Sequence, residues 1–327
     1  MVYDFKEKLD KADRIILAEL DRNCRIPSAR LAKIARKSRQ SVEYRIRRLL
    51  ERGIITSFNT SINPHRMGYK IYKIYLQLRN VPEEKKRLFT YMRKSGIVYW
   101  MGECDGAWDL IFGVFAKSDY EFYTLKNEII SEFGNIIVKN FHDVLVDVKQ
   151  YPKMYFTGEL REPVMFAGEL VPSGLDDLDH KILGEIVNNG RIPVTELATR
   201  VDSNPATVAA RMKKMVQSGV IIQYRIGINL NALGLEHYKA IMHLERYTKE
   251  DEKKLLAYMS SLPGIQYFIR NIWDIEPEIV VPSYHDYREL MEKVKLEFPF
   301  VIKNIESVLM KTDEWTPGYR NLLGAKP

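Results

Sequence analysis

The first sixty residues carry hydrophobic positions at helical spacing, in short groups separated by breaks. Leu17 and Leu20 lie on one face of a first predicted helix, and Arg25-Ile26-Pro27 ends it because proline cannot continue a helix. The apolar group at 31–35 predicts a short second helix, for which Ser28 is the expected cap. The pattern therefore predicts two helices joined by a tight break.

A third helix is predicted to begin after Ser38, a suitable cap, and to stop at Gly53. Val42, Ile46 and Leu49 have the spacing of a stripe that faces the core. A β-rich stretch over 54–63 follows. The order helix, helix, tight turn, helix is that of a helix-turn-helix domain.

The pattern then changes to strand alternation. Strands are expected over 70–79, 97–103, 107–116 and 136–147, with helices starting at Pro82 and covering 119–133. The order βαββαβ is that of a ferredoxin-like domain.

The same pattern occurs again 166 residues later. Residues 9–69 align with 175–235 without a gap and match at 19 of 61 positions, which indicates an internal duplication. The similarity continues with Trp108-Asp109 on Trp273-Asp274. The fold class is therefore α+β, with two copies of a helix-turn-helix, winged-helix-like domain followed by a ferredoxin-like domain. The predicted domains are 1–64, 65–156, 175–230 and 231–327, and residues 157–174, with two prolines and three glycines, are their connection.

Charge is distributed unevenly along a chain whose net charge is +7. Residues 1–60 hold 15 Lys and Arg against 8 Asp and Glu, whereas the equivalent residues 167–226 hold 7 of each. A polyanionic partner is therefore expected at one end of the molecule.

Several other classes are not indicated. No apolar run approaches the ~18 residues of a membrane span, and the charged start lacks an apolar signal region, so a cytoplasmic protein without membrane contact is expected. Two cysteines, Cys24 and Cys104, exclude a disulfide framework. The histidines have no metal-ligand spacing, and nucleotide-binding and hydrolase motifs are missing, so we expect neither a metal nor a cofactor.

The strongest functional signal is the third predicted helix of the first copy. With the apolar stripe facing inward, Ser41, Tyr44, Arg45 and Arg48 are expected to share an outward face, where a recognition helix meets the major groove. Arginine bonds to guanine and glutamine to adenine, and flanking cations meet phosphates. The alternative is a solvated basic helix face. The predicted DNA-contacting residues are Arg36, Lys37, Ser38, Arg39, Gln40, Ser41, Tyr44, Arg45, Arg47, Arg48 and Arg52.

The second copy has the same predicted order of helices, but different side chains on its third helix. Ser203 is the expected cap, and alanines stand where the first copy has Gln40 and Tyr44. The cations left for DNA are Arg211, Lys213 and Lys214. This helix is expected to bind DNA weakly or chiefly to pack.

The pattern L-D-x-x-D-x-x-I-L, R-I-P, L-A, S-x-x-x-V-x-x-R-I-x-x-L and G-I-I, followed by a βαββαβ domain, resembles the Lrp/AsnC family of feast/famine regulators. The resemblance covers nearly the whole chain, twice. It implies a transcription regulator that reads double-stranded DNA and assembles through its ferredoxin-like domains. Family members usually carry one unit per chain, so this chain is a covalent pseudo-dimer. Its sheets are expected to pair within the chain or between two chains, and a homodimer is expected.

The resemblance also implies a small effector, often an amino acid, bound at the ferredoxin-like interface. The effector site maps to the central turn, where glycines let a ligand approach the backbone and an aspartate can pair with an amino group. The same residues are also typical of a tight β-turn with a capping aspartate. The predicted effector residues are Gly102, Asp105, Gly106, Trp108 and Asp109.

Two other readings of the same architecture are open. Siroheme decarboxylases resemble tandem or paired Lrp-like units, but their pattern near the central strand, similar to H-C-Y-R-R, is replaced here by Tyr99-Trp100-Met101-Gly102. We therefore expect no enzyme. An assembly protein that has lost DNA binding is the other reading, and the basic first copy argues against it.

Overall fold

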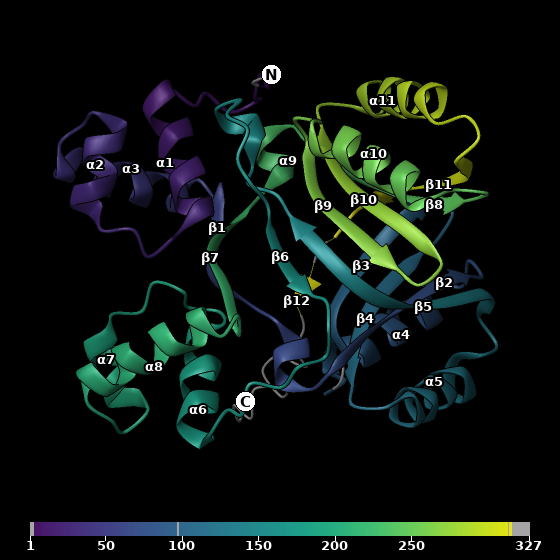
Figure 1. Cartoon of the computed structure of the whole chain (residues 1–327), viewed down its shortest axis with the longest axis horizontal. Coiled ribbons are helices and arrows are strands. Elements are labelled where there is room, and N and C mark those ends of the chain that lie inside the picture. The colour runs from purple at the N-terminus through teal and green to yellow at the C-terminus, as the bar shows by residue number, and fades with distance from the viewer. Residues whose placement is uncertain (1–2, 97, 313, 316–327) are drawn as a thin grey trace.

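The computed structural model describes residues 3–96, 98–312 and 314–315. Two helical domains lie on one side of the molecule, and strands flanked by helices lie on the other (Figure 1). A two-stranded ribbon stands between the two parts. Among the described residues, no helix has the length and the apolar run needed to cross a membrane.

The first helical domain contains α1 (Lys11–Arg22), α2 (Ser28–Ala35) and α3 (Arg39–Glu51), followed by β1 (Ile55–Ile62). The second contains α6 (Asp177–Ile186), α7 (Val194–Arg200) and α8 (Pro205–Gln217), followed by β7 (Ile221–Ile228). Both have the predicted order. Ser38 accepts a hydrogen bond from the Ser41 N–H and so caps α3 as expected, and Gly53 follows α3 with φ of 64°.

Two expected caps are wrong. Ser28 is the first residue of α2, and Pro27 holds the cap position without a side-chain hydrogen bond. The cap of α8 is Asn204, whose side chain accepts from the Thr207 N–H, and Ser203 lies one residue earlier. A proline at the boundary already fixes the backbone, so it displaces the serine from the capping position of α2.

The first ferredoxin-like domain contains β2 (Lys70–Leu78), α4 (Pro82–Lys94), β3 (Val98–Gly106), β4 (Leu110–Ala116), α5 (Asp119–Phe133) and β5 (Ile137–Gln150). The second contains β8 (Glu236–Leu244), α10 (Lys249–Ser260), β9 (Ile265–Asn271), β10 (Asp274–Val281), α11 (Tyr284–Glu297) and β11 (Ile302–Met310). Both therefore have the predicted βαββαβ order.

The strands of the two domains close into one barrel. The order is β11-β8-β10-β9-β5-β2-β4-β3, and β11 also pairs with β3. The last strand of each domain pairs first within its own sheet and then with the sheet of the other domain. The first part of β5 pairs with β2 and its end pairs with β9, and the first part of β11 pairs with β8 and its end pairs with β3. The predicted sheet pairing is therefore made within the chain.

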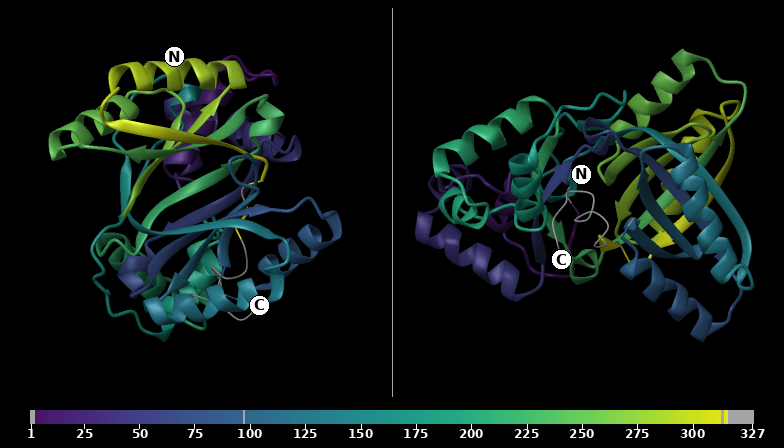
Figure 2. Two further views of the ribbon diagram at one scale, coloured as in Figure 1. Left: turned by 90° about the vertical axis from the view of Figure 1, so that its right-hand side faces the viewer. Right: turned by 90° about the horizontal axis from the view of Figure 1, so that it is seen from below.

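The barrel is covered from outside by its helices. In Figure 2 (left), α4 and α5 lie on one side of the strands and α10 and α11 on the other. Apolar side chains of each helical pair form a separate core with one half of the barrel. The side chains on the other face of every strand therefore point into the barrel.

Shorter elements complete the chain. They are η1 (Pro64–Met67), η2 (Met154–Phe156), β6 (Val164–Ala167), α9 (Leu230–Leu233) and β12 (Glu314–Trp315). The segment expected to be a plain connection, 157–174, contains β6, which pairs with the end of β5.

The ribbon is built from β1 and β7, which pair antiparallel. Asn59 lies directly opposite Arg225 in the register. These two positions are equivalent in the duplication, so the pseudo-two-fold axis of the chain passes between them.

Candidate nucleic-acid interface and internal cavity

Helix α3 presents a basic and polar surface. Its inward positions Val42, Ile46 and Leu49 are buried in the core of the first helical domain, as the spacing predicts. Gln40 and Arg47 are exposed, and the Tyr44 side chain is 61% exposed. Because these three side chains are exposed, they are available to a partner.

Arg45 and Arg48 do not share that outward face, which corrects the prediction from spacing. Arg45 bonds to Asp10 at 2.7 Å and to Asp13 at 2.8 Å, and Arg48 bonds to Asp13 at 2.7 Å. The Asp13 side chain is only 1% exposed. These two arginines therefore hold α3 against α1, and the charge of Asp13 is balanced by them.

The second domain repeats this clamp. Arg211, equivalent to Arg45, pairs with Asp176 and Asp179, the equivalents of Asp10 and Asp13. All three positions match in the duplication, and that match was a usable signal for a structural role. Arg211 is thus not a free cation for DNA, whereas Lys213 and Lys214 are exposed.

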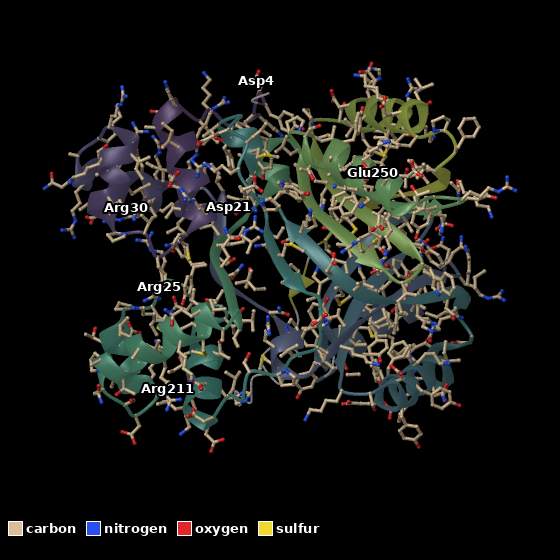
Figure 3. All side chains as sticks on the ribbon, viewed as in Figure 1. Asp4, Asp21, Arg25, Arg30, Arg211 and Glu250 are labelled. Atoms are coloured by element: carbon tan, nitrogen blue, oxygen red, sulfur yellow. The ribbon has the colours of Figure 1, made fainter. Side chains whose placement is uncertain are left out.

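Exposed cations are concentrated on the first domain. Arg36 and Lys37 lie in the turn before α3, and Figure 3 marks Arg30 on α2. Arg39 is exposed and bonds to Glu43 at 2.8 Å, and Arg52 pairs with Glu7. The exposed residues at positions equivalent to Arg30, Lys33 and Arg36 are Glu196, Thr199 and Asp202. The two domains therefore differ most where they face solvent.

The glycines of the central turn are packed against the same chain rather than beside an open space. A side chain at Gly102 would meet Met310 at 2.3 Å, and one at Gly106 would meet the Ser307 carbonyl oxygen at 2.5 Å. Gly106 pairs with Val308 where β11 joins β3. The turn is thus the place where the barrel closes, and this close approach requires glycine.

The other predicted effector residues are also engaged. Trp108 is buried and donates from Nε1 to Glu306 at 2.9 Å. Asp109 accepts from the Leu78 N–H at 2.8 Å and from Lys85 at 2.7 Å, and Asp105 pairs with Lys311 at 2.8 Å. These side chains are thus engaged by contacts within the chain, and an effector site at this turn stays a prediction.

A cavity of about 220 Å³ lies between the ribbon and the barrel. Sequence patterns do not predict this cavity, because its wall combines residues from both units. Its apolar wall includes Ile71, Phe115, Val148, Ile226 and Ile269. Its polar wall includes Lys73, Lys153, Arg225, His237, Gln266 and Glu278.

Toward the barrel, the cavity meets a buried ionic network. Glu276 bonds to Lys73 and, at 3.0 Å, to Lys239, and Lys239 also bonds to Glu278. Burial lowers the pKa of Lys73 to about 8, against the attraction of Glu276. Two cations and two carboxylates balance one another, so the network adds no net charge to the cavity wall.

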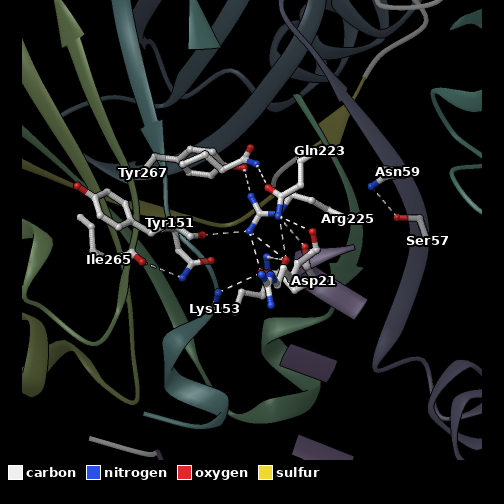
Figure 4. Close-up of polar contacts among 12 residues, drawn as sticks. Asp21, Ser57, Asn59, Tyr151, Lys153, Gln223, Arg225, Ile265 and Tyr267 are labelled. Carbon is white, nitrogen blue, oxygen red and sulfur yellow. Dashed lines mark hydrogen bonds and ion pairs between the residues drawn. The ribbon is translucent and has the colours of Figure 1, made fainter. Parts of the chain in front are cut away.

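Toward the first helical domain, the cavity meets a second cluster (Figure 4). Asp21, near the end of α1, accepts from Arg225 Nε at 3.0 Å and from Lys153 Nζ at 3.0 Å. Arg225 also donates from Nη2 to the Tyr151 carbonyl oxygen at 3.2 Å. Burial raises the pKa of Asp21, but the positive charges of Arg225 and Lys153 outweigh burial and hold this pKa below its usual value. This cluster joins α1 to the ribbon and to the segment after β5.

Comparisons with known proteins agree with this architecture. Residues 9–56 and 175–222 each match the family of winged helix-turn-helix DNA-binding domains. The chain is 30% identical over 143 residues to the proline dehydrogenase transcriptional activator of Rhodobacter capsulatus, which covers 42% of this chain and 91% of that protein. It is 33% identical over 105 residues to the leucine-responsive regulatory protein of Rhizobium meliloti (strain 1021). This match covers 32% of this chain and 65% of that protein.

A solved structure is similar along the whole chain. The siroheme decarboxylase NirDL has a TM-score of 0.64 and 12% identity, and the match covers 96% of this chain and 97% of that one. At this identity the likeness concerns the fold. The fold and the helical motifs thus define a tandem protein of winged helix-turn-helix and ferredoxin-like units. The chain belongs to the Lrp/AsnC family, as its sequence pattern predicts.

Proposed function

We propose that this chain is a regulator that binds double-stranded DNA, with the first helix-turn-helix making most of the contacts. One observation carries the proposal: exposed cations surround α3, and their equivalents around α8 are acidic or neutral at several positions. Phosphate contacts supply much of the affinity for DNA, and base contacts at the start of a recognition helix supply specificity.

The residues that support this role are the exposed members of the predicted set. Gln40 lies at the start of α3, where a glutamine can bond to adenine in the major groove, and Arg39 and Arg47 flank it. Arg45 and Arg48 act indirectly in this proposal, because their ion pairs fix the angle of α3 on α1. The regulators among the relatives agree with this role.

A binding assay with genomic fragments at about 50 and 200 mM salt tests the proposal. The wild-type chain is expected to keep a specific site at the higher salt. Gln40→Ala is expected to weaken that site about tenfold, whereas Lys214→Ala in the second domain leaves it nearly unchanged. Loss of all fragments at the higher salt, or equal effects of the two variants, would contradict the proposal.

A decarboxylase is the second candidate, and the whole-chain fold similarity to NirDL favours it. The proposal of a regulator is preferred because exposed cations surround α3 and because the sequence relatives of the chain include regulators. Titration of the purified chain with siroheme, followed by absorption and by release of carbon dioxide under reducing and oxidising conditions, separates the candidates.

A further inference from the structure

We infer that a pocket between the two helix-turn-helix domains binds a phosphate group that carries two negative charges, and that Arg25 and Arg191 hold this group from the two sides. The inference follows from the position of the two arginines, from the partners that they have and from the charge of the pocket wall. It concerns a binding site and does not depend on the proposed function.

The pocket has a volume of about 390 Å³ and lies where the two domains meet. Arg25 comes from the turn between α1 and α2, and Arg191 from the turn between α6 and α7. Figure 3 shows Arg25 between the two domains. The two arginines are equivalent in the duplication, so the pocket receives the same residue from each unit.

Arg25 links the two domains without a carboxylate partner. Its Nη1 group donates to the Gly190 carbonyl oxygen at 2.8 Å and to the Ile192 carbonyl oxygen at 2.9 Å. Its guanidinium carbon lies 5.5 Å from the centre of the Tyr224 ring. Within residues 3–96, 98–312 and 314–315, no carboxylate pairs with Arg25, and its Nε and Nη2 groups have no hydrogen-bond partner. These two groups are available to a ligand.

Arg191 occupies the equivalent position and has even fewer partners. Its guanidinium carbon lies 5.2 Å from the centre of the Phe58 ring, and Phe58 is the equivalent of Tyr224. Its Nη1 group is buried and has no hydrogen-bond partner in the part of the chain that the structure describes. Burial lowers the pKa of Arg191, and the positive charge of Arg25 lowers it further. A cation in this position is stabilised by an anion, to which a turn of the Arg191 side chain presents its N–H groups.

The charge of the wall defines the charge of the ligand. Arg39 is the third arginine of the wall, and it bonds to Glu43 at 2.8 Å. Its side chain is 70% exposed, so it lies on the solvent side of the pocket. Among the described residues, three guanidinium groups and one carboxylate leave two positive charges in excess. An anion with two charges balances them, whereas an anion with one charge balances only half.

A phosphate group fits this wall better than a carboxylate does. Guanidinium groups bind phosphate oxygens through paired N–H groups, and a phosphate bonded to one carbon carries about 1.5 to 2 negative charges near pH 7. The volume falls within the ~300–1,000 Å³ of ligand pockets, so it has room for a small body beside the phosphate. The wall next to the arginines is made of Ile26, Pro27 and Ala29, which have no charge to offer. Free phosphate and the phosphate ester of a small uncharged molecule share this chemistry.

The experiment uses the full chain and three phosphate probes in calorimetry at about pH 7.5 and constant ionic strength, which keeps screening the same. Glycerol 3-phosphate and inorganic phosphate carry the double charge. Dimethyl phosphate has a single charge and represents a phosphodiester of the DNA backbone. Glycerol alone controls for the uncharged body.

The doubly charged probes are expected to bind at least tenfold more tightly than dimethyl phosphate, and glycerol is expected not to bind. Tighter binding of glycerol 3-phosphate than of inorganic phosphate identifies an ester as the ligand, and equal binding identifies free phosphate; both results support the site. Equal or tighter binding of dimethyl phosphate would overturn the inference, and so would the absence of binding at about 10 mM of the doubly charged probes.

The variants change Arg191, because its Nη1 has no partner to lose. Arg191→Met is expected to weaken phosphate binding at least tenfold without lowering the melting temperature in the absence of phosphate. Arg191→Lys keeps the charge without the paired N–H groups and is expected to bind about threefold more weakly than the wild type. Arg79→Met is the matched control, because Arg79 is an exposed arginine that lies outside the pocket. Undiminished binding by Arg191→Met, or an equal loss in Arg79→Met, would overturn the assignment.

Hydrogen exchange tests whether the phosphate joins the two domains. A ligand held by Arg25 and Arg191 is expected to slow the exchange of backbone N–H groups in both turns, 23–27 and 189–193, because each turn opens less often when its arginine is bound. Slower exchange in one turn alone would contradict a phosphate shared between the domains. The measurement needs no DNA, so its result is independent of whether the chain is a regulator.

Discussion

Helices α2 and α7 are both followed by a turn with one left-handed residue, Arg36 in the first helix-turn-helix and Asp202 in the second, each with φ of 52°. Arg45 of α3 pairs with two aspartates at the start of α1, and Arg211 of α8 pairs with two aspartates at the start of α6. The backbone and the clamp are thus the same, whereas the charge of the residue in the turn is reversed.

The comparison separates two kinds of position. Residues that are identical in both units, such as Asp13 and Asp179, hold the helices together and are nearly buried. Residues that differ, such as Arg30 and Glu196, are exposed. Both units have therefore kept the residues that hold the helices together, whereas only the first unit has a basic surface. The buried link from Asp21 to Arg225 adds a difference inside the molecule, because Val187 stands at the equivalent place.

The largest effect is expected at that buried link. Asp21→Asn leaves Arg225 and Lys153 without their carboxylate, and breaking a buried pair costs on the order of 3–5 kcal/mol. The pKa of Asp21 is lowered in the folded state, so its stabilisation is present above the unfolded value of about 3.9 and is lost as the pH falls through the lower folded value. Urea unfolding at pH 7 measures the loss of stability, and urea unfolding in acid measures its dependence on pH.

The difference in unfolding free energy between wild type and Asp21→Asn is therefore expected to shrink in acid. Asp10→Asn is the control, because that carboxylate is 54% exposed and its loss costs far less. Equal stability of Asp21→Asn and wild type at pH 7 would contradict the role given to the link.

The next effect concerns the exposed charges. Arg30→Glu with Arg36→Asp gives the first domain the residues of the second, and Asp is already compatible with the left-handed turn at 202. Loss of two cations and gain of two anions is expected to weaken DNA binding about 100-fold at moderate salt. The reverse exchange, Glu196→Arg with Asp202→Arg, is expected to strengthen it. Fluorescence anisotropy with one DNA fragment measures both, and an unchanged affinity in the first exchange would refute the asymmetry.

A smaller effect is expected from the clamps. Arg45→Ala removes one of two arginines from Asp13, which is 1% exposed, and should lower the unfolding free energy by about 1.5–3 kcal/mol. Arg211 is 31% exposed, so Arg211→Ala should cost about 1 kcal/mol or less. Thermal or urea unfolding compares them. A DNA-binding defect of Arg45→Ala at full stability would instead return Arg45 to the groove-facing set.

Much of the fold follows from local patterns. The strand predicted over 70–79 is β2, Lys70–Leu78, and the helix predicted from Pro82 is α4, because strand alternation and a proline at a helix start are local signals. Closure of the barrel is different. It depends on pairing β5 with β9 and β11 with β3, which are far apart in the sequence, so no periodicity reports it.

The candidate site was predicted only in part, for the same reason. Spacing placed Val42 inward and Tyr44 outward correctly, but Arg45 lies beside the apolar stripe and its partner Asp10 is 35 residues away. The strand pattern predicts only that Lys73 belongs to a strand, because its partner Glu276 comes from the other unit. A side chain whose direction is set by a distant charge is not determined by its neighbours in sequence.

The smallest effect is expected for Arg47 and Lys213, which are equivalent and exposed at the outer faces of α3 and α8. If the first domain alone binds tightly, Arg47 contacts a phosphate and Lys213 stays in solvent. Each phosphate contact contributes about 0.9 to the slope of log K against log salt concentration. Arg47→Ala is therefore expected to lower that slope by about one with a few-fold loss of affinity, and Lys213→Ala to change neither. Titrations of one DNA fragment at four salt concentrations resolve this difference, and equal slope changes in both variants would mean that both domains contact DNA alike.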